Sequence, residues 1–196
     1  MIKKLVFLMI FISSLFATSE SIINKTAQDS SDSQDSNTLQ DSQDLPKNHC
    51  KNGDIMGYWL SPRDKESGRY SIVEIFKKDG KYFAYQVVFM DSQPSKKDTL
   101  NQNFALRDRE VLGSVHIYNL EREGQNSYIN GRYYDFNKGK SFHLKARLEC
   151  DKLILLVSAD NVGFLGKQKT YKFLDIKEAE FYIKEKPNID FSGVPE

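Results

Sequence analysis

Apolar and polar residues alternate along short stretches of the chain, and turn residues separate one stretch from the next. The stretches with this alternation cover residues 57–60, 70–77, 81–90, 111–120, 127–136, 141–149, 152–159 and 169–174. A period of two is typical of β-strands with one buried face, and tight turns join antiparallel neighbours. The pattern therefore predicts an all-β domain of about eight antiparallel strands, folded either as a closed barrel or as a sandwich.

The clearest hairpin spans residues 71–90, SIVEIFKKDGKYFAYQVVFM. Asp79 and Gly80 predict a two-residue turn with positive φ at both positions, which fixes the strand register. With this turn, the side chains that share one face are those of Ile72, Glu74, Phe76, Phe83, Tyr85, Val87 and Phe89. A single carboxylate, Glu74, therefore lies among apolar and aromatic residues.

Two further hairpins continue an apolar face in the same way. A turn at residues 137–140 puts Tyr133 and Leu144 on one face, and a turn at residues 150–151 extends that face into residues 153–157. The charged or polar side chains on the opposite face are His143, Lys145 and Arg147. A sheet that keeps one face inward from strand to strand is most simply closed on itself, which also removes edge strands. We therefore expect an antiparallel eight-stranded up-and-down barrel.

Five motifs carry a resemblance to known proteins. They are GYWL (57–60), SIVEIFKKDGKYFAYQV (71–87), ALRDREVLG (105–113), YYDFNKGKSF (133–142) and GFLGKQKTYKF (163–173). In this order they resemble DUF2147, a family of exported bacterial proteins of unknown function, and GYW resembles the Gly-x-Trp signature of lipocalins. The resemblance covers residues 53–174 and implies a secreted or periplasmic lipocalin-like barrel, without an established activity. It also implies a cation against Trp59, for which Lys169 and Lys172 are the candidates.

Glu74 has two interpretations, both of which place it inside the barrel. A buried carboxylate must be paired, hydrogen-bonded or protonated. In the first interpretation, Glu74, Tyr85 and Tyr133 are the polar anchors of a ligand cavity. Its apolar walls are then Trp59, Ile72, Phe76, Phe83, Val87 and Leu144. In the second, the core is filled, and Glu74 accepts hydrogen bonds from a tyrosine hydroxyl and a backbone amide or pairs with an arginine.

The family resemblance favours the cavity. The expected ligand is a small hydrophobic or amphipathic molecule, with fatty-acid-like molecules among the candidates. The alternative is an interaction protein, whose filled barrel displays its loops to a protein partner without a small-molecule ligand.

Residues 91–110, DSQPSKKDTLNQNFALRDRE, carry no strand pattern and make a longer connection than hairpins usually have. Loops of this length are often lids or binding loops. Arg107 and Arg109 flank Asp108, which makes Arg107 the candidate to meet an anionic ligand group at the barrel mouth. The alternating charges favour the alternative, an internal Arg–Asp network that holds the loop on the barrel.

The two ends of the chain differ from the barrel. Residues 1–19 combine two lysines with an apolar run and small residues, which is typical of a secretory signal peptide. Residues 20–48 repeat Asp, Ser and Gln, so we expect a disordered acidic tether. The barrel then occupies 49–174, and 175–196 form a C-terminal helix, capped by Asp175, with a tail. These features predict a periplasmic or secreted protein without stable membrane insertion.

The two cysteines both follow the predicted signal peptide. In an oxidising compartment, a Cys50–Cys150 disulfide is favoured over two free thiols. The bridge would close a loop of about 100 residues, which in the chain-entropy model stabilises the fold by roughly 4 to 5 kcal/mol. It would hold the start of the barrel to its wall.

Composition and motifs argue against several function classes. The formal net charge is +1, and no basic stripe suited to nucleic acid is present. His49, His116 and His143 are dispersed and lack metal-ligand spacing. Nucleophile-elbow, phosphate-loop and zinc-peptidase motifs are absent from the sequence. We therefore expect a binding protein without enzymatic activity, cofactor or metal, whose oligomeric state the sequence does not indicate.

Overall fold

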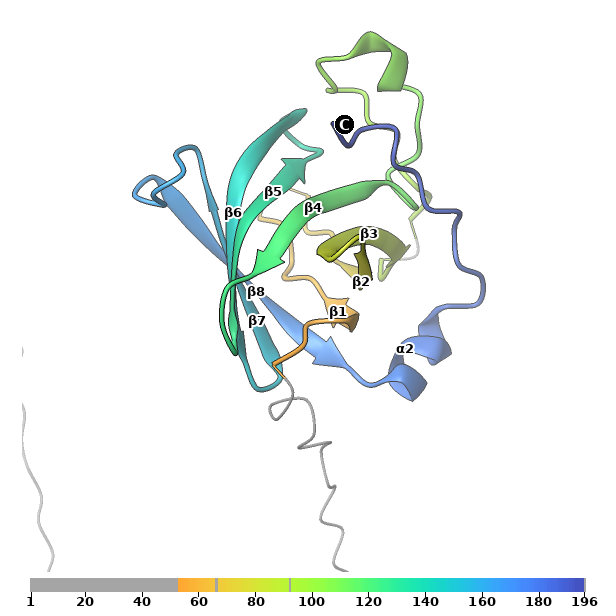
Figure 1. The fold of residues 1–196 in the computed structure, drawn as a ribbon. Helices are drawn as coiled ribbons and strands as arrows, with labels where there is room; N and C mark the ends of the chain where they lie inside the picture. Colours follow the sequence, from red (N-terminus) through yellow and green to blue (C-terminus); the bar gives the residue numbers. More distant parts are fainter. Residues whose placement is uncertain (1–52, 66, 92, 196) are drawn as a thin grey trace, which may run out of the picture. The chain divides into compact units, whose positions relative to one another are not determined.

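The computed structural model describes residues 53–65, 67–91 and 93–195. In this part the chain forms a closed barrel in which every strand pairs with its sequence neighbours and β8 pairs with β1 (Figure 1). The strands are β1 (Gly57–Leu60), β2 (Ser71–Lys78), β3 (Lys81–Phe89), β4 (Val115–Arg122), β5 (Ser127–Asp135), β6 (Lys140–Glu149), β7 (Lys152–Ser158) and β8 (Gly166–Leu174). The predicted eight-stranded antiparallel barrel is confirmed.

Two short helices accompany the barrel in the described residues. A 3-10 helix, η1 (Phe104–Leu106), lies in the long β3–β4 connection, and α2 (Ile176–Tyr182) follows β8. The Asp175 side chain caps α2 by accepting the backbone N–H of Lys177 at 2.8 Å. The predicted C-terminal helix is therefore confirmed. The predicted signal peptide, tether and Cys50 lie outside the described residues.

The β2–β3 hairpin has the predicted turn and, over most of its length, the predicted register. Asp79 and Gly80 have φ values of 49° and 81°, as a primed turn requires. Glu74 pairs with Tyr85 and Phe76 with Phe83. The register shifts between Ile72 and Val73, so that Ile72 pairs with Val88 where the sequence predicted Val87.

The buried residues form two separate cores. The first is the barrel interior, to which all eight strands contribute, and it includes Trp59, Val73, Ile75, Tyr82, Ala84, Ile117, Tyr128, Tyr133, Leu144, Leu155 and Tyr171. The second lies on the outer wall formed by strands β1 to β5, and it includes Tyr58, Ile72, Phe83, Tyr85, Val87, Val115, Tyr118, Tyr134 and Leu174. A covering segment must keep this outer core away from water.

The C-terminal strap, residues 183–195, is that covering segment. After α2 it runs along the outside of β2 to β4 (Figure 1). The Phe191 ring lies 6.1 Å from the ring of Phe76 and 5.7 Å from the ring of Phe83, both edge-on. Backbone hydrogen bonds join Asp190 to Gly113 and Val115 at 2.9 and 3.0 Å. The strap is thus fixed to the wall by both side chains and backbone.

The strap explains why the face of the β2–β3 hairpin that was predicted to point inward is in fact the outer one. The predicted inward residues, Ile72, Glu74, Phe76, Phe83, Tyr85 and Val87, lie on the outer wall. The residues that point inward are Val73, Ile75, Tyr82 and Ala84. Both faces of the hairpin are apolar because both are covered, and alternation alone cannot then tell the interior from the exterior.

Two asparagines with positive φ interrupt the regular alternation of inward and outward side chains in β4 and β5. Asn119 in β4 has φ 56° and Asn130 in β5 has φ 60°. The β5–β6 register changes between Tyr128 and Gly131, so that Tyr128 is buried in the interior where regular alternation predicted Ile129. Asparagine tolerates this left-handed conformation better than most residues, which makes it suited to such bulges.

Cys150 is exposed in the β6–β7 turn, has φ 50° and carries a free thiol in the structure. Because Cys50 lies outside the described residues, the Cys50–Cys150 disulfide stays a prediction. No helix of residues 53–65, 67–91 and 93–195 is long and apolar enough to cross a membrane.

Candidate functional site at the open end of the barrel

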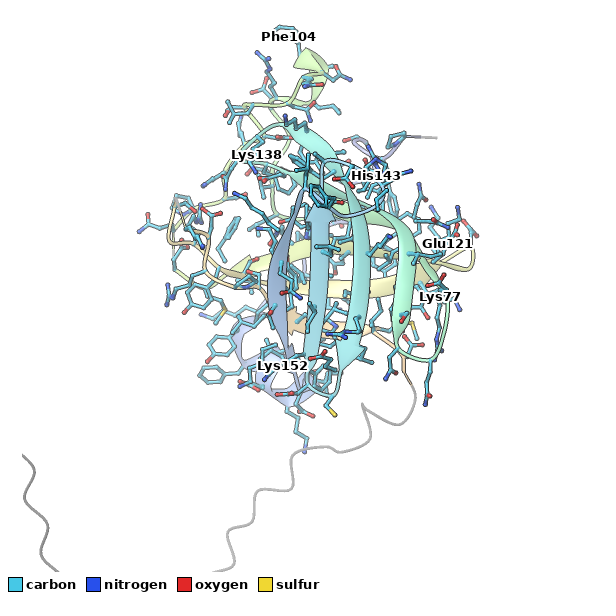
Figure 2. The ribbon with its side chains drawn as sticks, turned by 90° about the vertical axis from the view of Figure 1, so that its left-hand side faces the viewer. Lys77, Phe104, Glu121, Lys138, His143 and Lys152 are labelled. Atoms are coloured by element: carbon cyan, nitrogen blue, oxygen red, sulfur yellow. The ribbon has the colours of Figure 1, made fainter. Side chains whose placement is uncertain are left out.

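Four connections, including the three longest, meet at one end of the barrel. The antiparallel order places the loops 61–70, 90–114, 136–139 and 159–165 at this open end and the tight turns at the other. Figure 2 shows Phe104 and Lys138 toward the open end and Lys152 at the opposite, closed end. Loops held by a rigid scaffold are the usual location of binding sites, so the open end is where a site is expected.

The closed end is filled by aromatic side chains. Trp59 is fully buried, and its Nε1 donates a hydrogen bond to the Ile55 carbonyl at 2.9 Å. The ring of Phe173 packs edge-on against Trp59, at a centroid distance of 5.4 Å. The family resemblance implied a lysine of β8, Lys169 or Lys172, as the neighbour of Trp59. The Tyr82 and Tyr128 rings meet edge-on at 5.2 Å. A ligand can therefore enter only from the open end.

A cavity of about 100 Å³ lies at the open end. Its inner lining comes from strand residues that point into the barrel, and loop residues form its mouth. The lining residues include Ser71, Gln86, Phe89, Val111, Tyr133, Asp135, Phe136, Lys169 and Tyr171. Cavities for drug-sized ligands usually measure roughly 300 to 1,000 Å³. This cavity is therefore large enough for the head group of a ligand and too small for a long chain.

Lys169 brings a positive charge to the cavity wall. It points inward from β8, and its Nζ lies 5.4 Å from the centroid of the Tyr133 ring. No carboxylate of the described residues forms an ion pair with it. Burial raises the pKa of Tyr171 to about 12 and the pKa of Tyr133 well above its ordinary value, so both phenols keep their protons at neutral pH. The Tyr133 and Tyr171 hydroxyls hydrogen-bond to each other, so the wall offers one ammonium group and one hydroxyl proton to a ligand.

Arg69 and Asp135, two other charged groups around the cavity, have partners within the protein, whereas Lys96 lines its rim, is exposed and forms no ion pair among the described residues. Arg69 donates to Asp91, with Nε at 2.6 Å from Oδ2. Asp135 pairs with Lys138 at 3.3 Å. The Ser71 hydroxyl donates to the side-chain oxygen of Gln86, which is buried beside it. These pairs fix the shape of the mouth and leave Lys169 as the inward-facing cation that can pair with a ligand.

His116 is fully buried next to this wall. Its ring lies 5.8 Å from the Tyr133 ring, edge-on, and both of its ring nitrogens lack a hydrogen-bond partner in the described part of the chain. Burial, aided by the positive charge of Lys169, lowers the pKa of His116 to about 3. His116 is therefore neutral at physiological pH and does not compete with Lys169 for an anion.

The structure separates the residues that the sequence grouped as one site. Of the predicted set, Tyr133 lines the cavity, and Trp59 and Leu144 belong to the interior core. The predicted residues on the outer wall are Ile72, Glu74, Phe76, Phe83, Tyr85 and Val87, beneath or beside the strap. They are too remote from the interior to line the cavity, because the wall of the barrel lies between.

Glu74 is paired on the outer wall. Lys186 of the strap places Nζ at 3.0 Å from both carboxylate oxygens, and the Tyr85 hydroxyl donates to Oε2. The side chains of Glu74 and Lys186 are 22% and 46% exposed. Glu74 is thus internally paired, as the filled-core interpretation required. Its cationic partner is a lysine and not an arginine, and the pair lies on the outside of the barrel. Glu74 ties the strap to β2.

Glu74→Gln is expected to weaken the strap slightly and to leave the cavity unchanged. A partly exposed ion pair stabilises a protein by about 0 to 1 kcal/mol. In a double-mutant cycle with Lys186→Met, followed by urea unfolding, we expect a coupling free energy below about 1 kcal/mol. Ligand binding at the open end should be the same in all four proteins. If Glu74→Gln alone lost ligand binding, Glu74 would have to be a ligand-binding residue.

The long β3–β4 loop is held by an internal Arg–Asp network, as its alternating charges favoured. The network centres on Asp98, which is fully buried and accepts from Arg109 at 2.9 Å and from the Tyr134 hydroxyl at 3.0 Å. Arg107 takes a different role from the predicted ligand contact. Its Nε donates to the Asn101 carbonyl at 2.8 Å, and its guanidinium covers the Phe104 ring at 3.8 Å.

Comparison with known proteins assigns the chain to a family. Residues 57–172 match the family model DUF2147, described as an uncharacterized protein conserved in bacteria. The chain belongs to the DUF2147 family. The comparison with curated proteins gave no match.

Two solved structures resemble this DUF2147 protein. Protein HP1028 from Helicobacter pylori, described as belonging to the lipocalin family, is 30% identical and aligns with a TM-score of 0.65, covering 70% of this chain and 94% of HP1028. As-p18, described as an extracellular fatty acid binding protein, is 10% identical with a TM-score of 0.34, covering 61% of this chain and 96% of As-p18. The first likeness confirms the lipocalin-like fold; the second is too weak to carry an argument.

Sequence reasoning missed most of the cavity wall. Lys169, Tyr171, Gln86 and Ser71 all line it, and Lys169 had been considered only as a partner for Trp59. The signal was the β8 stretch KTYKF, in which Lys169, Tyr171 and Phe173 alternate with exposed residues. Phe173 packs on Trp59 at the closed end. Every second residue before it also points inward, so Lys169 lies nearer the mouth of the barrel.

Proposed function

We propose that this DUF2147 protein is an exported, lipocalin-like binding protein for a small amphipathic molecule with an anionic group. The anionic group would occupy the cavity at the open end, where Lys169 provides the charge and the hydrogen-bonded pair of Tyr133 and Tyr171 provides one hydroxyl donor. The single observation that carries the proposal is Lys169, an inward-facing cation on the cavity wall without a carboxylate partner among the described residues.

The electrostatics of the wall support an anion over a cation. A half-buried ammonium group is partly desolvated, and an anionic partner compensates that cost with a charge-assisted hydrogen bond. The phenol proton that is not used in the Tyr133–Tyr171 hydrogen bond can be donated to the same group. A neutral imidazole at His116 adds no competing charge.

The size and lining of the cavity support an amphipathic ligand. A volume of about 100 Å³ accepts a carboxylate or similar group and a few carbon atoms. Within its lining, Phe89, Val111 and Phe136 offer apolar contact beside the polar groups. The remainder of the ligand would extend out through the mouth, because the closed end is already filled. The predicted export places such binding in the periplasm or outside the cell.

The decisive experiment is native mass spectrometry of the protein purified from its exporting host, followed by solvent extraction of any released molecule. A stoichiometric adduct of a few hundred daltons with an anionic group supports the proposal. An adduct that is uncharged or cationic contradicts it.

Lys169→Met is expected to lower the affinity for an anionic probe about tenfold to hundredfold, the range for a lost charge-assisted hydrogen bond. Isothermal titration with octanoate and with octanol measures the effect, and the affinity for octanol should change little. Lys172→Met is the matched control, because Lys172 lies on the same strand and is exposed. Equal octanoate affinity in wild type and Lys169→Met would reject the assigned role.

One observation favours a second function, that of a filled barrel which displays its loops to a protein partner. The interior is occupied by the rings of Trp59, Tyr82, Tyr128 and Tyr171, and the remaining space is small. A protein of this kind would show no adduct in the mass spectrum and no thermal stabilisation by octanoate or octanol.

A further inference from the structure

The β7–β8 loop presents a compact apolar tip at the open end. Val162 is 75% exposed, Phe164 is 90% exposed and Leu165 is 67% exposed. Single apolar side chains are common on protein surfaces, but three within four residues at the end of a hairpin form a patch. Such patches mark places where a protein meets another molecule or phase.

The loop is built to hold these side chains outward. The Asp160 carboxylate accepts the backbone N–H groups of Gly163, Phe164 and Leu165 at 2.6, 3.1 and 2.8 Å. Gly163 has φ 97°, a conformation that side chains rarely allow. The three bonds keep the tip from collapsing onto the barrel, so its apolar side chains stay in water until a partner covers them.

Lysines surround the tip. Over the halves of β6 and β8 that adjoin the loop, the exposed charged residues are Lys140, Lys145 and Lys167. Lys145 reaches the loop itself, with Nζ at 3.4 Å from the Val162 carbonyl oxygen. The acidic residue next to the tip is Asp160, whose carboxylate oxygens already accept hydrogen bonds from backbone N–H groups. The region thus combines a protruding apolar tip with a net positive rim.

A second apolar tip lies at the same end, in a loop whose exposed charges are of both signs and include the Lys97–Asp108 pair. In the β3–β4 loop, Phe104 is 76% exposed and Leu100 is 56% exposed. The Arg107 guanidinium lies over the Phe104 ring at 3.8 Å. Figure 2 shows Phe104 protruding at the end of the barrel opposite Lys152. Both tips therefore project from the open end.

We propose that the open end of the barrel docks peripherally on an anionic lipid surface, with Phe164 and Leu165 as the main inserted side chains. Aromatic and aliphatic tips enter the boundary between head groups and acyl chains, while surrounding lysines meet anionic head groups. Lipid is favoured over a protein partner because two separate apolar tips project from the same end, one of them with a lysine rim, and a fluid surface can accept separate projections. The inference is independent of the proposed ligand site.

Flotation of the protein, purified from its exporting host, with phosphatidylcholine vesicles and with vesicles containing phosphatidylglycerol tests the proposal without any ligand. We expect binding to the anionic vesicles, weakened by added salt. The double variant Phe164→Ser, Leu165→Ser should bind at least about tenfold more weakly, since it loses most of the inserted apolar area. The matched control is Phe181→Ser, Tyr182→Ser on α2, where Phe181 is 79% exposed.

The control should bind anionic vesicles as the wild type does, and circular dichroism should show that both double variants are folded. Failure of the wild type to float with anionic vesicles overturns the proposal. Equal flotation of the wild type and the Phe164 variant also overturns it, because another surface would then be responsible. If size-exclusion chromatography shows self-association that only the Phe164 variant loses, with no flotation, the tip belongs to a contact between copies.

Discussion

Replacing Trp59 with alanine is expected to lower the free energy of unfolding by about 3 to 5 kcal/mol, the range for removing a buried large aromatic side chain. Trp59 is fully buried at the closed end, hydrogen-bonded to the Ile55 carbonyl and packed against Phe173. Alanine removes the ring from a region where the neighbouring strands are already joined and cannot collapse to fill the space. Urea unfolding followed by circular dichroism measures the loss, since the variant lacks the single tryptophan.

Two control variants test whether the loss of stability depends on the size and burial of the Trp59 ring. Trp59→Phe keeps an aromatic ring and should cost less than Trp59→Ala. Phe181→Ala removes an exposed ring from α2 and should change the free energy of unfolding by less than about 0.5 kcal/mol. A loss below about 1 kcal/mol in Trp59→Ala would show that the closed end is not a rigidly packed core.

Gly139→Ala is expected to lower the free energy of unfolding by about 2 to 4 kcal/mol, from backbone strain and overpacking together. Gly139 lies in the β5–β6 turn with φ 63°, and an added Cβ would overlap the Leu100 carbonyl oxygen. The overlap is with backbone, so the β3–β4 loop must move. Chemical denaturation measures the stability, and limited proteolysis of residues 98–107 reports the displaced loop.

Gly80→Ala provides the matched control. Gly80 has φ 81° but meets no atom within 4 Å of an added Cβ. It should therefore show the strain alone, roughly 1 to 2 kcal/mol, without faster proteolysis of the β3–β4 loop. If the two variants lose the same free energy, the close approach between the β5–β6 turn and the β3–β4 loop does not contribute to stability.

Local signals in the sequence were sufficient for the hairpins, because each depends on residues close together in the chain, whereas the closure that pairs β1 with β8 had to be inferred from the continuous apolar face. The Asp79–Gly80 turn fixes a hairpin by its own backbone preferences, and the alternating runs then follow. Asp175 likewise caps α2 through a bond to Lys177. The exceptions among local features were the bulges, such as the one at Asn130, where one residue with positive φ moved Tyr128 inward.

The candidate site was harder to predict because it depends on which face of each strand points inward. In β2, Glu74 stands out only against apolar neighbours, and that apolar face exists because the strap covers it from outside. The partner that decides the matter, Lys186, lies 112 residues further along the chain. In β8, by contrast, exposed residues alternate with inward ones, and the sequence could have identified Lys169.

The strap has a consequence for how the protein is made. The outer wall of β2 to β4 is synthesised before residues 183–195, which cover Ile72, Phe83 and Val87. During synthesis, the nascent chain therefore carries an apolar surface that its later residues have yet to protect, and exposed apolar surface of this kind promotes aggregation. The strap thus completes the folded state last, and truncation before Phe191 is expected to reduce the yield of soluble protein.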